Sequence, residues 1–262
     1  MNNILSGIET LLFCDETKFY INAGDSEDAI YYFAVAVDKR AVPKIHSDFK
    51  RLLVASGVKS SIYHSTSVFK ESRPRERLMN DLTQFIINNQ LHTFCYKYSK
   101  NIYFEQTINL RIFNTDILNF HRAEFQALFY FLIVLNTYLR DRLVSVPVKE
   151  EIAMYFDRNV YGTHEIEAFK FPSEHFILKQ MTFTEKSEIS LLSLPDFLGY
   201  IFRKSKQSQD KFESGNKSIE TSPLVINCYS CLTQINAHKL FTFLDVNDTI
   251  LSRAVQIISR SS

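Results

Sequence analysis

Three aspartates occupy positions where a carboxylate can hold a metal ion or assist a reaction. Asp15 and Asp157 each follow an apolar run with the pattern of a buried strand, and Asp196 lies among leucines in a predicted helix. An unpaired buried carboxylate is costly, so each requires a cationic side chain, backbone donors or a metal ion. If the two strands are neighbours, their ends converge, and a helix across that edge completes a cluster of negative charges. A divalent cation with oxygen ligands is the natural partner of such a cluster.

A structural role for the same aspartates is also consistent with their spacing. Each can serve as a helix cap, a turn residue or a salt-bridge partner, and aspartates at strand ends are common in turns. On spacing alone this role is the commoner one. Both alternatives therefore stay open at this point.

Four short segments follow one another in a distinctive order: FCDET (13–17), YHSTSVF (63–69), AMYFDRN (153–159) and SLLSLPDFLGYIFR (190–203). Over roughly residues 10–204 the chain resembles the bacterial family labelled domain of unknown function 3800, whose members look like ribonuclease-H-fold proteins. That family typically has Asp-Glu-Ser-Gly after its first strand and a Glu-x-His segment. An Asp then closes a later strand, and Leu-Gln-x-Ala-Asp opens a helix.

The resemblance implies a ribonuclease-H-like fold and functions for five residues. Asp15 and Glu16 match the first motif, His64 the second, Asp157 the third and Asp196 the fourth. Ribonuclease-H-like nucleases cleave phosphodiesters with two divalent ions held by carboxylates from central strands and a neighbouring helix. By resemblance, the three aspartates are ligands of Mg²⁺ or Mn²⁺, and Glu16 and His64 are catalytic helpers. His64 would shuttle a proton or orient the attacking water, unless it is a hydrogen-bonded structural residue.

The chain also departs from the family pattern. The replacements are Thr17-Lys18 for Ser-Gly, Ile62 for Glu, and Ser193 and Pro195 for Gln and Ala. Proline fits the first turn of a helix, so the helix is predicted to begin close to Asp196. The missing Glu removes one potential metal ligand, so the remaining acids suffice for one ion and leave a second ion in question. A catalytically silent family member therefore stays open as well.

Two other groups of residues carry weaker signals. Cys228-x-x-Cys231 lacks the second ligand pair of a zinc site and the βαβ context of a redox pair, so it predicts ordinary buried cysteines. Basic residues follow the Asp196 helix and form either part of a phosphate path or a solvated helix end and polar loop. They are Arg203, Lys204, Lys206 and Lys211.

The elements that must position these residues follow an α/β order. Apolar or alternating runs predict strands at 11–14, 30–37, 92–98, 151–157 and 176–183. Helical spacing predicts helices at 43–56, after Pro74, at 116–143 and at 189–203. The resulting domain spans 1–204, followed by a polar linker or loop over 205–222. A helical extension over 223–262, with a last helix beginning at Asn247 or Asp248, is predicted to pack on the core.

Composition narrows the class of protein. The chain has 262 residues, a net charge of +1 and only six glycines, and it contains neither of the glycine-rich motifs that cradle nucleotide phosphates. Its longest apolar runs are shorter than the ~18–20 residues that a membrane-spanning helix needs. Four cysteines are too few to crosslink a chain of this length, so we expect a reduced, cytoplasmic protein without membrane partners.

These observations together predict an α/β protein with a ribonuclease-H-like mixed sheet flanked by helices. The predicted function is that of a metal-dependent nuclease, or a related nucleic-acid-processing protein, acting on RNA or DNA. It would use Mg²⁺ or Mn²⁺ in a two-metal or one-metal carboxylate mechanism. The alternative is a catalytically silent ribonuclease-H-like subunit that serves binding or assembly, in phage defence or a mobile element.

Overall fold

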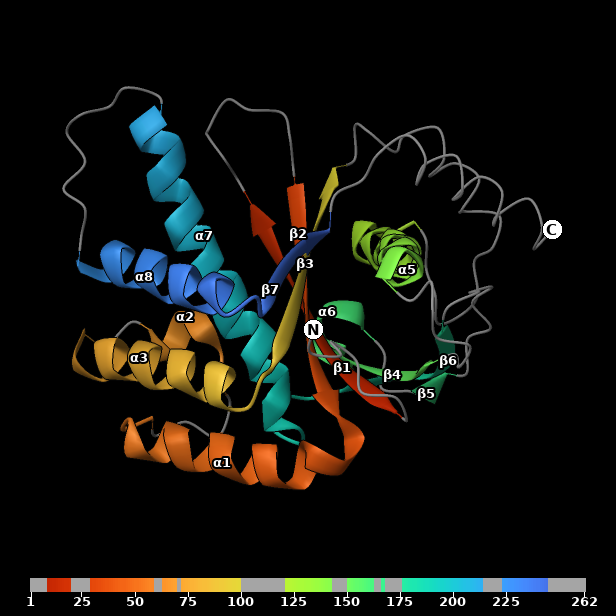
Figure 1. The fold of residues 1–262 in the computed structure, drawn as a ribbon, viewed down its shortest axis with the longest axis horizontal. Coiled ribbons are helices and arrows are strands. Elements are labelled where there is room, and N and C mark those ends of the chain that lie inside the picture. The colour runs from red at the N-terminus through yellow and green to blue at the C-terminus, as the bar shows by residue number, and fades with distance from the viewer. Residues whose placement is uncertain are drawn as a thin grey trace.

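The fold is built on a seven-stranded mixed sheet with the strand order β5-β6-β4-β1-β2-β3-β7 (Figure 1). The computed structural model describes residues 9–19, 29–58, 63–69, 72–99, 121–142, 150–162, 166–167, 176–213 and 223–244. The strands are β1 (Thr10–Phe19), β2 (Ala29–Asp38), β3 (His92–Ser99), β4 (Glu150–Asp157), β5 (Ile166–Glu167), β6 (Phe176–Thr184) and β7 (Phe241–Leu244). Strand β2 is antiparallel to both β1 and β3, and β5 is antiparallel to β6. Strand β4 is parallel to both β1 and β6, and β7 is parallel to β3.

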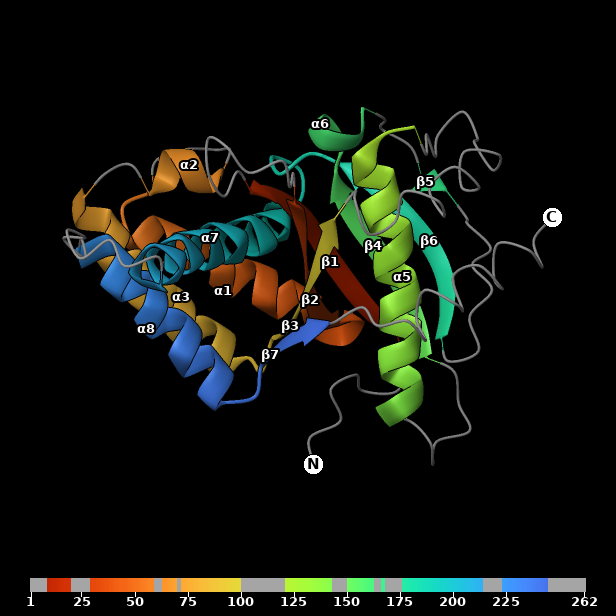
Figure 2. The ribbon, with the colours of Figure 1, turned by 90° about the horizontal axis from the view of Figure 1, so that it is seen from above.

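Helices cover both faces of this sheet. They are α1 (Val42–Ala55), α2 (Ser65–Val68), α3 (Ser72–Asn88), α5 (Ala123–Arg142), α6 (Arg158–Tyr161), α7 (Ser193–Glu213) and α8 (Pro223–Ala237), with 3-10 turns η1 (Lys39–Ala41) and η3 (Ser190–Leu192). Figure 2 shows α5 on one side of the sheet and α1, α3, α7 and α8 on the other. The protein therefore has three layers. Among the described residues, no helix is long and apolar enough to cross a membrane.

Strand β1 separates two hydrophobic cores because its side chains alternate between the faces of the sheet. Leu11 and Phe13 pack into the core under α1, α3, α7 and α8. Leu12 and Cys14 pack into the core under α5. The same alternation sends the next two side chains, Asp15 and Glu16, to opposite faces.

The predicted α/β class, with a mixed sheet flanked by helices, is confirmed. Each strand and helix predicted within the described residues overlaps an observed one. The long helix α5 is buried on nearly all sides over residues 125–135. A helix that is apolar all round belongs in the interior, as its sequence indicated. The part of this prediction before residue 121 lies outside the described residues.

Three boundaries differ from the predictions. Strand β1 continues through Asp15 to Phe19, because antiparallel pairing with β2 extends to its end. Helix α7 continues to Glu213, so the predicted linker begins as helix, since its Lys and Gln residues are good helix formers. The predicted helical extension contains strand β7, which pairs parallel with β3 at the sheet edge. The helix predicted from Asn247 or Asp248 lies outside the described residues.

Candidate functional site

Two of the three aspartates meet because β1 and β4 are parallel neighbours. The pairing of β1 with β4 ends at Cys14, opposite Phe156, so Asp15 and Asp157 are the next residues along the two strands. Carboxyl ends of parallel strands lie at the same edge of a sheet, which places both side chains at one spot. The convergence predicted for neighbouring strands is therefore present, although Asp15 lies within β1 rather than at its end.

Helix α7 brings the third aspartate to the same place. Asp196 lies in the first turn of α7, and Pro195 immediately before it is compatible with a helix start. One turn later, Gly199 lets the helix approach the sheet closely. A Cβ atom at Gly199 would lie 3.0 Å from Oγ1 of Thr17 and 3.3 Å from the ring of Phe33. The close approach of α7 to β1 and β2 thus sets the position of Asp196.

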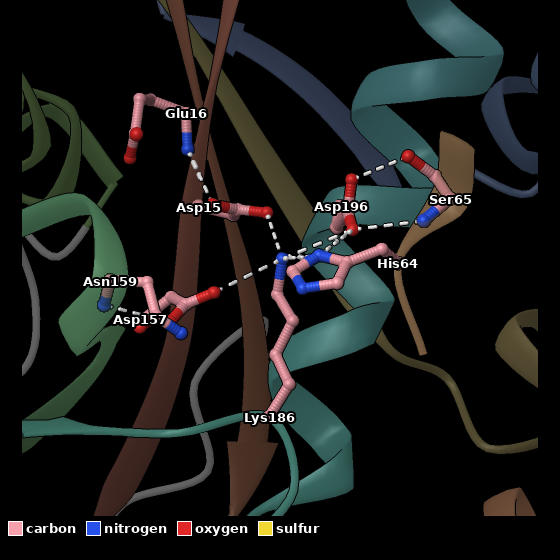
Figure 3. A network of polar contacts seen from close by, with 8 residues as sticks. All are labelled: Asp15, Glu16, His64, Ser65, Asp157, Asn159, Lys186 and Asp196. Atoms are coloured by element: carbon pink, nitrogen blue, oxygen red, sulfur yellow. Dashed lines mark hydrogen bonds and ion pairs between the residues drawn. The ribbon is translucent and has the colours of Figure 1, made fainter. Parts of the chain in front are cut away.

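The ammonium group of Lys186 stands at the centre of the three carboxylates (Figure 3). Its Nζ atom lies 3.0 Å from Oδ2 of Asp15, 3.0 Å from Oδ2 of Asp196 and 3.5 Å from Oδ2 of Asp157. It also lies 3.4 Å from Nδ1 of His64. The Lys186 side chain is only 5% exposed, so this ion-pair cluster is screened from water. We call these five residues the Lys186 cluster.

The two carboxylate oxygens of Asp157 have different roles: one caps a helix and the other faces Lys186. Its Oδ1 accepts hydrogen bonds from the backbone N–H and the side-chain amide of Asn159, each at 3.1 Å. The carboxylate is thereby the N-cap of α6. Its Oδ2 points to Lys186. The capping bonds fix the orientation of the oxygen that faces the cluster.

Asp196 is held by the short helix α2. Its Oδ1 accepts a hydrogen bond from the Ser65 hydroxyl at 2.6 Å, and its Oδ2 accepts one from the Ser65 backbone N–H at 3.0 Å. Ser65 is itself buried. Residues 131 positions apart in sequence are thus tied together, and α2 is fixed against the start of α7.

The electrostatics of Asp15 and Asp196 differ because their hydrogen-bond donors differ. Burial raises the pKa of Asp15 to about 7, and the charge of Lys186 only partly offsets this. Burial also acts to raise the pKa of Asp196, but hydrogen bonds from His64 and Ser65 and the charge of Lys186 bring it well below its usual range. Burial would lower the pKa of Lys186, but the surrounding carboxylates raise it, so the ammonium keeps its proton. The anionic form is therefore better stabilised in Asp196 than in Asp15.

His64 lies at the solvent edge of the cluster. Its Nδ1 is 3.6 Å from Oδ2 of Asp196, and its side chain is 40% exposed. The hydrogen bond to Asp196 raises the pKa of His64. When protonated, Nδ1 donates toward Asp196, and when deprotonated it accepts from Lys186, so the ring has two alternative partners. A histidine that reaches both water and a carboxylate can exchange protons with solvent.

Glu16 is the one predicted site residue that the structure does not bring into the cluster. Its backbone N–H donates to Oδ1 of Asp15 at 3.1 Å, but its carboxylate points away from Lys186 (Figure 3). Burial and the charge of Asp15 raise the pKa of Glu16 well above its usual value. Its catalytic role stays a prediction, because only its backbone, and not its carboxylate, contacts the cluster.

The carboxylate oxygens of the cluster are the ligand type that a hard divalent cation prefers, whereas their present spacing matches an ammonium group. Mg²⁺, Mn²⁺ and Ca²⁺ bind carboxylate oxygens at ~2.0–2.6 Å, and the three aspartates supply such oxygens around one point. The distances to Lys186 Nζ are 3.0–3.5 Å. As the side chains stand, the described part of the chain contains no group of three or more His, Cys, Asp or Glu residues placed to hold a metal ion. The residues fit a metal ion only if Lys186 moves away.

Lys186 and Ser65 are the site residues that the sequence patterns did not identify. Lys186 lies in a polar turn between β6 and η3, with Ser187 and Glu188 around it, and resembles an ordinary solvated loop lysine. For Lys186, the balance of charge in the cluster was the feature of the sequence that could have identified it. Three acids that converge in a buried place require a cation, and the segment directly before the Asp196 helix offers one.

The remaining candidates have structural roles where the structure describes them. Cys228 and Cys231 are both buried in the core, and Sγ of Cys231 donates to the backbone carbonyl of Met79. The prediction of ordinary buried cysteines is thus confirmed. Ile62, which replaces the family's Glu, lies outside the described residues.

The sequence matches no known protein-family model, and none of the characterised proteins is a significant relative. The resemblance described above therefore stays a prediction, and any function must be argued from the Lys186 cluster itself.

Proposed function

We propose that this chain is a divalent-metal-dependent nuclease with a ribonuclease-H-like fold. The observation that carries the proposal is the convergence of Asp15, Asp157 and Asp196 on one cation-binding point. These acids come from two adjacent central strands and a neighbouring helix, which is the arrangement that the resemblance implies. Asp157 and Asp196 are 142 and 181 positions from Asp15 in sequence, and all three meet within one buried cluster. Aspartates with separate roles in turns would not converge in this way.

In this proposal the three aspartates hold the metal ion, most directly through the oxygens that now face Lys186. A divalent ion bound there supplies Lewis-acid activation of water and stabilises the leaving oxygen of a phosphodiester. Ser65 keeps the Asp196 carboxylate in position through two hydrogen bonds. His64, half exposed at the edge of the cluster, exchanges the proton of the attacking water or of the leaving group with solvent.

The surface beside the cluster supports a nucleic-acid substrate. Asp196, Tyr200, Arg203 and Lys204 are spaced to lie along one face of α7. Arg203 and Lys204 place their cationic groups 5.6 and 5.9 Å from the centre of the Tyr200 ring. The ring in turn stacks on Phe69 at 4.9 Å. At ~1.5 Å per residue, Arg203 lies about 10 Å along the helix from Asp196, within reach of neighbouring phosphates of a bound strand.

A cleavage assay tests the proposal. End-labelled single-stranded and double-stranded RNA and DNA are incubated with purified protein in Mg²⁺ or Mn²⁺, and in EDTA as the control. Asp157→Asn keeps the size of the side chain but removes a charge that the ion requires, so we expect cleavage to fall by at least ~100-fold. Asp81→Asn, at a surface ion pair on α3, should cleave like the wild type. Absence of wild-type cleavage on all four substrates, or full activity of Asp157→Asn, would contradict the proposal.

A second function is favoured by the position of Lys186. An ammonium group already lies between the carboxylates. It would serve as a permanent replacement for a metal ion in a catalytically silent binding or assembly subunit. Wild-type metal binding separates the two functions. The nuclease requires Mg²⁺ or Mn²⁺ to enter the Lys186 cluster, and the silent subunit does not bind either ion.

A further inference from the structure

We infer that Lys186 is an internal counter-ion of the cluster, and that a divalent metal ion must displace its ammonium group to bind. The inference rests on the metal site of the proposed function and adds a residue that governs its occupancy. It follows from where Nζ lies, from how the lysine is buried and from what its side chain can do.

The first observation is positional. The Nζ atom of Lys186 contacts one oxygen from each of Asp15, Asp157 and Asp196, which are the oxygens proposed for the metal ion. To hold an ion at ~2.0–2.6 Å, these oxygens must move inward by about 1 Å. The space they would close on is the space that the ammonium group fills. The two cations therefore cannot occupy the cluster together.

The second observation concerns burial. The side chains of Lys186, Asp15 and Asp157 are 5%, 7% and 2% exposed, so water cannot compensate their charges. Three carboxylates drawn together without a cation repel one another strongly. Lys186 therefore stabilises the cluster when no metal ion is bound. The same stabilisation opposes metal binding, because an ion must replace these contacts.

The third observation concerns freedom of movement. Lys186 lies in the turn between β6 and η3, where Glu188 and Ile189 donate backbone hydrogen bonds to Glu185. The turn is fixed, but a lysine side chain has four rotatable carbon bonds and a compact charge. Rotation about these bonds, rather than a shift of the hydrogen-bonded turn, would carry the ammonium group out of the cluster. The displaced charge stays beside the site, where a phosphate group would be its natural partner.

Isothermal titration with Mn²⁺ at constant pH tests this competition. Lys186→Met retains the length of the side chain without its charge, and Lys179→Met removes a lysine from the surface pair with Glu151 as the matched control. We expect Lys186→Met to bind Mn²⁺ at least tenfold more tightly than wild type, equivalent to about 1.4 kcal/mol. In EDTA it should melt below wild type, and saturating Mn²⁺ should remove or reverse that difference. Lys179→Met should match wild type in Mn²⁺ affinity.

The outcomes separate this inference from the proposed function. Tighter binding by Lys186→Met, with no binding by wild type, supports the inference and contradicts a metal-dependent wild-type enzyme. Binding of equal affinity by both proteins overturns the inference and leaves the nuclease standing. If Lys186→Met unfolds in EDTA, recovery of cooperative unfolding in Mn²⁺ supports the inference. Failure to recover, while Lys186→Arg folds normally, overturns it.

Discussion

The hydrogen bonds from Ser65 to Asp196 give the most direct test of how the site is assembled. Ser65→Ala removes the hydroxyl that donates to Oδ1 of Asp196 at 2.6 Å and keeps the backbone donor to Oδ2. Among the described residues, Ser65 is the hydrogen-bond donor to that oxygen. A hydrogen bond to a charged group contributes roughly 1.5–3 kcal/mol, and the Asp196 side chain, 15% exposed, recovers part of this from water. We therefore expect a loss of about 1–2 kcal/mol of unfolding free energy.

The assay is urea unfolding and thermal unfolding at pH 7 and at pH 3, both in EDTA. For a chain of this size, 1–2 kcal/mol corresponds to a decrease of roughly 2–8 °C in melting temperature. The pKa of Asp196 is lowered in the folded state, so its contribution is complete above the unfolded value of ~3.9 and is lost as pH falls toward the folded value. The folded-state carboxylate is still ionised at pH 3, so the Ser65→Ala effect should be nearly the same at pH 3 as at pH 7.

Ser67→Ala is the matched control, because Ser67 lies in the same helix α2 and is exposed. It should change the free energy of unfolding by less than ~0.5 kcal/mol. Equal stability of Ser65→Ala and Ser67→Ala at pH 7 would refute the role of Ser65. Loss of most of the Ser65→Ala effect at pH 3 would contradict the lowered pKa of Asp196, because the folded carboxylate would then already be protonated.

Four further results are expected. Gly199→Ala should lower stability by about 1 kcal/mol, because crowding against Thr17 exceeds the gain in helix propensity, and adding Thr17→Ala should restore most of the loss. In thiol titration with Ellman's reagent, all four cysteines should react only after denaturation, since each is buried. Millimolar Mn²⁺ should raise the wild-type melting temperature by roughly 5–11 °C at 100 times its dissociation constant, and Asp15→Ala should abolish most of the rise. Replacing Arg203 and Lys204 by alanine should reduce the salt dependence of single-strand binding by about 1.4 in the log–log slope.

Each of these results has its own control. Val54→Ala, at a 70% exposed position, should leave stability nearly unchanged where Gly199→Ala lowers it. Rapid reaction of any thiol in the native protein would contradict the described burial. A rise in melting temperature that persists in Asp15→Ala would locate metal binding elsewhere. An unchanged salt slope in the double variant would remove the α7 face from the nucleic-acid interface.

Most strands and helices could be predicted from the sequence, because these elements have strong local patterns of side-chain type and spacing. The β2 run from Ile30 to Val37 and the helix opened by Pro43 were recognisable from side-chain type and spacing alone. Strand β7 was missed because only four residues pair with β3. Such a short strand is determined by its neighbour in space, which a local pattern does not contain. The same limit applied to β1, whose second half depends on pairing with β2.

The site was predicted in part, for a related reason. The meeting of Asp15 and Asp157 followed from an assumption that their strands are adjacent, and β1 and β4 are adjacent. Lys186 was missed because a lysine in a polar turn has no distinctive local pattern; its burial depends on α7 and β1 folding around it. Glu16 was assigned to the site because Asp15 and Glu16 match the first motif of the resemblance, yet neighbours in a strand face opposite sides of the sheet.

The proposed function depends most directly on whether a divalent ion binds between the three aspartates. Anomalous diffraction from crystals soaked in Mn²⁺ measures this. We expect a manganese peak within ~2.0–2.6 Å of oxygens from at least two of Asp15, Asp157 and Asp196, with Lys186 Nζ moved out of the cluster. The absence of a peak there, with Lys186 Nζ still about 3.0 Å from Asp15 and Asp196, would contradict the proposed metal site.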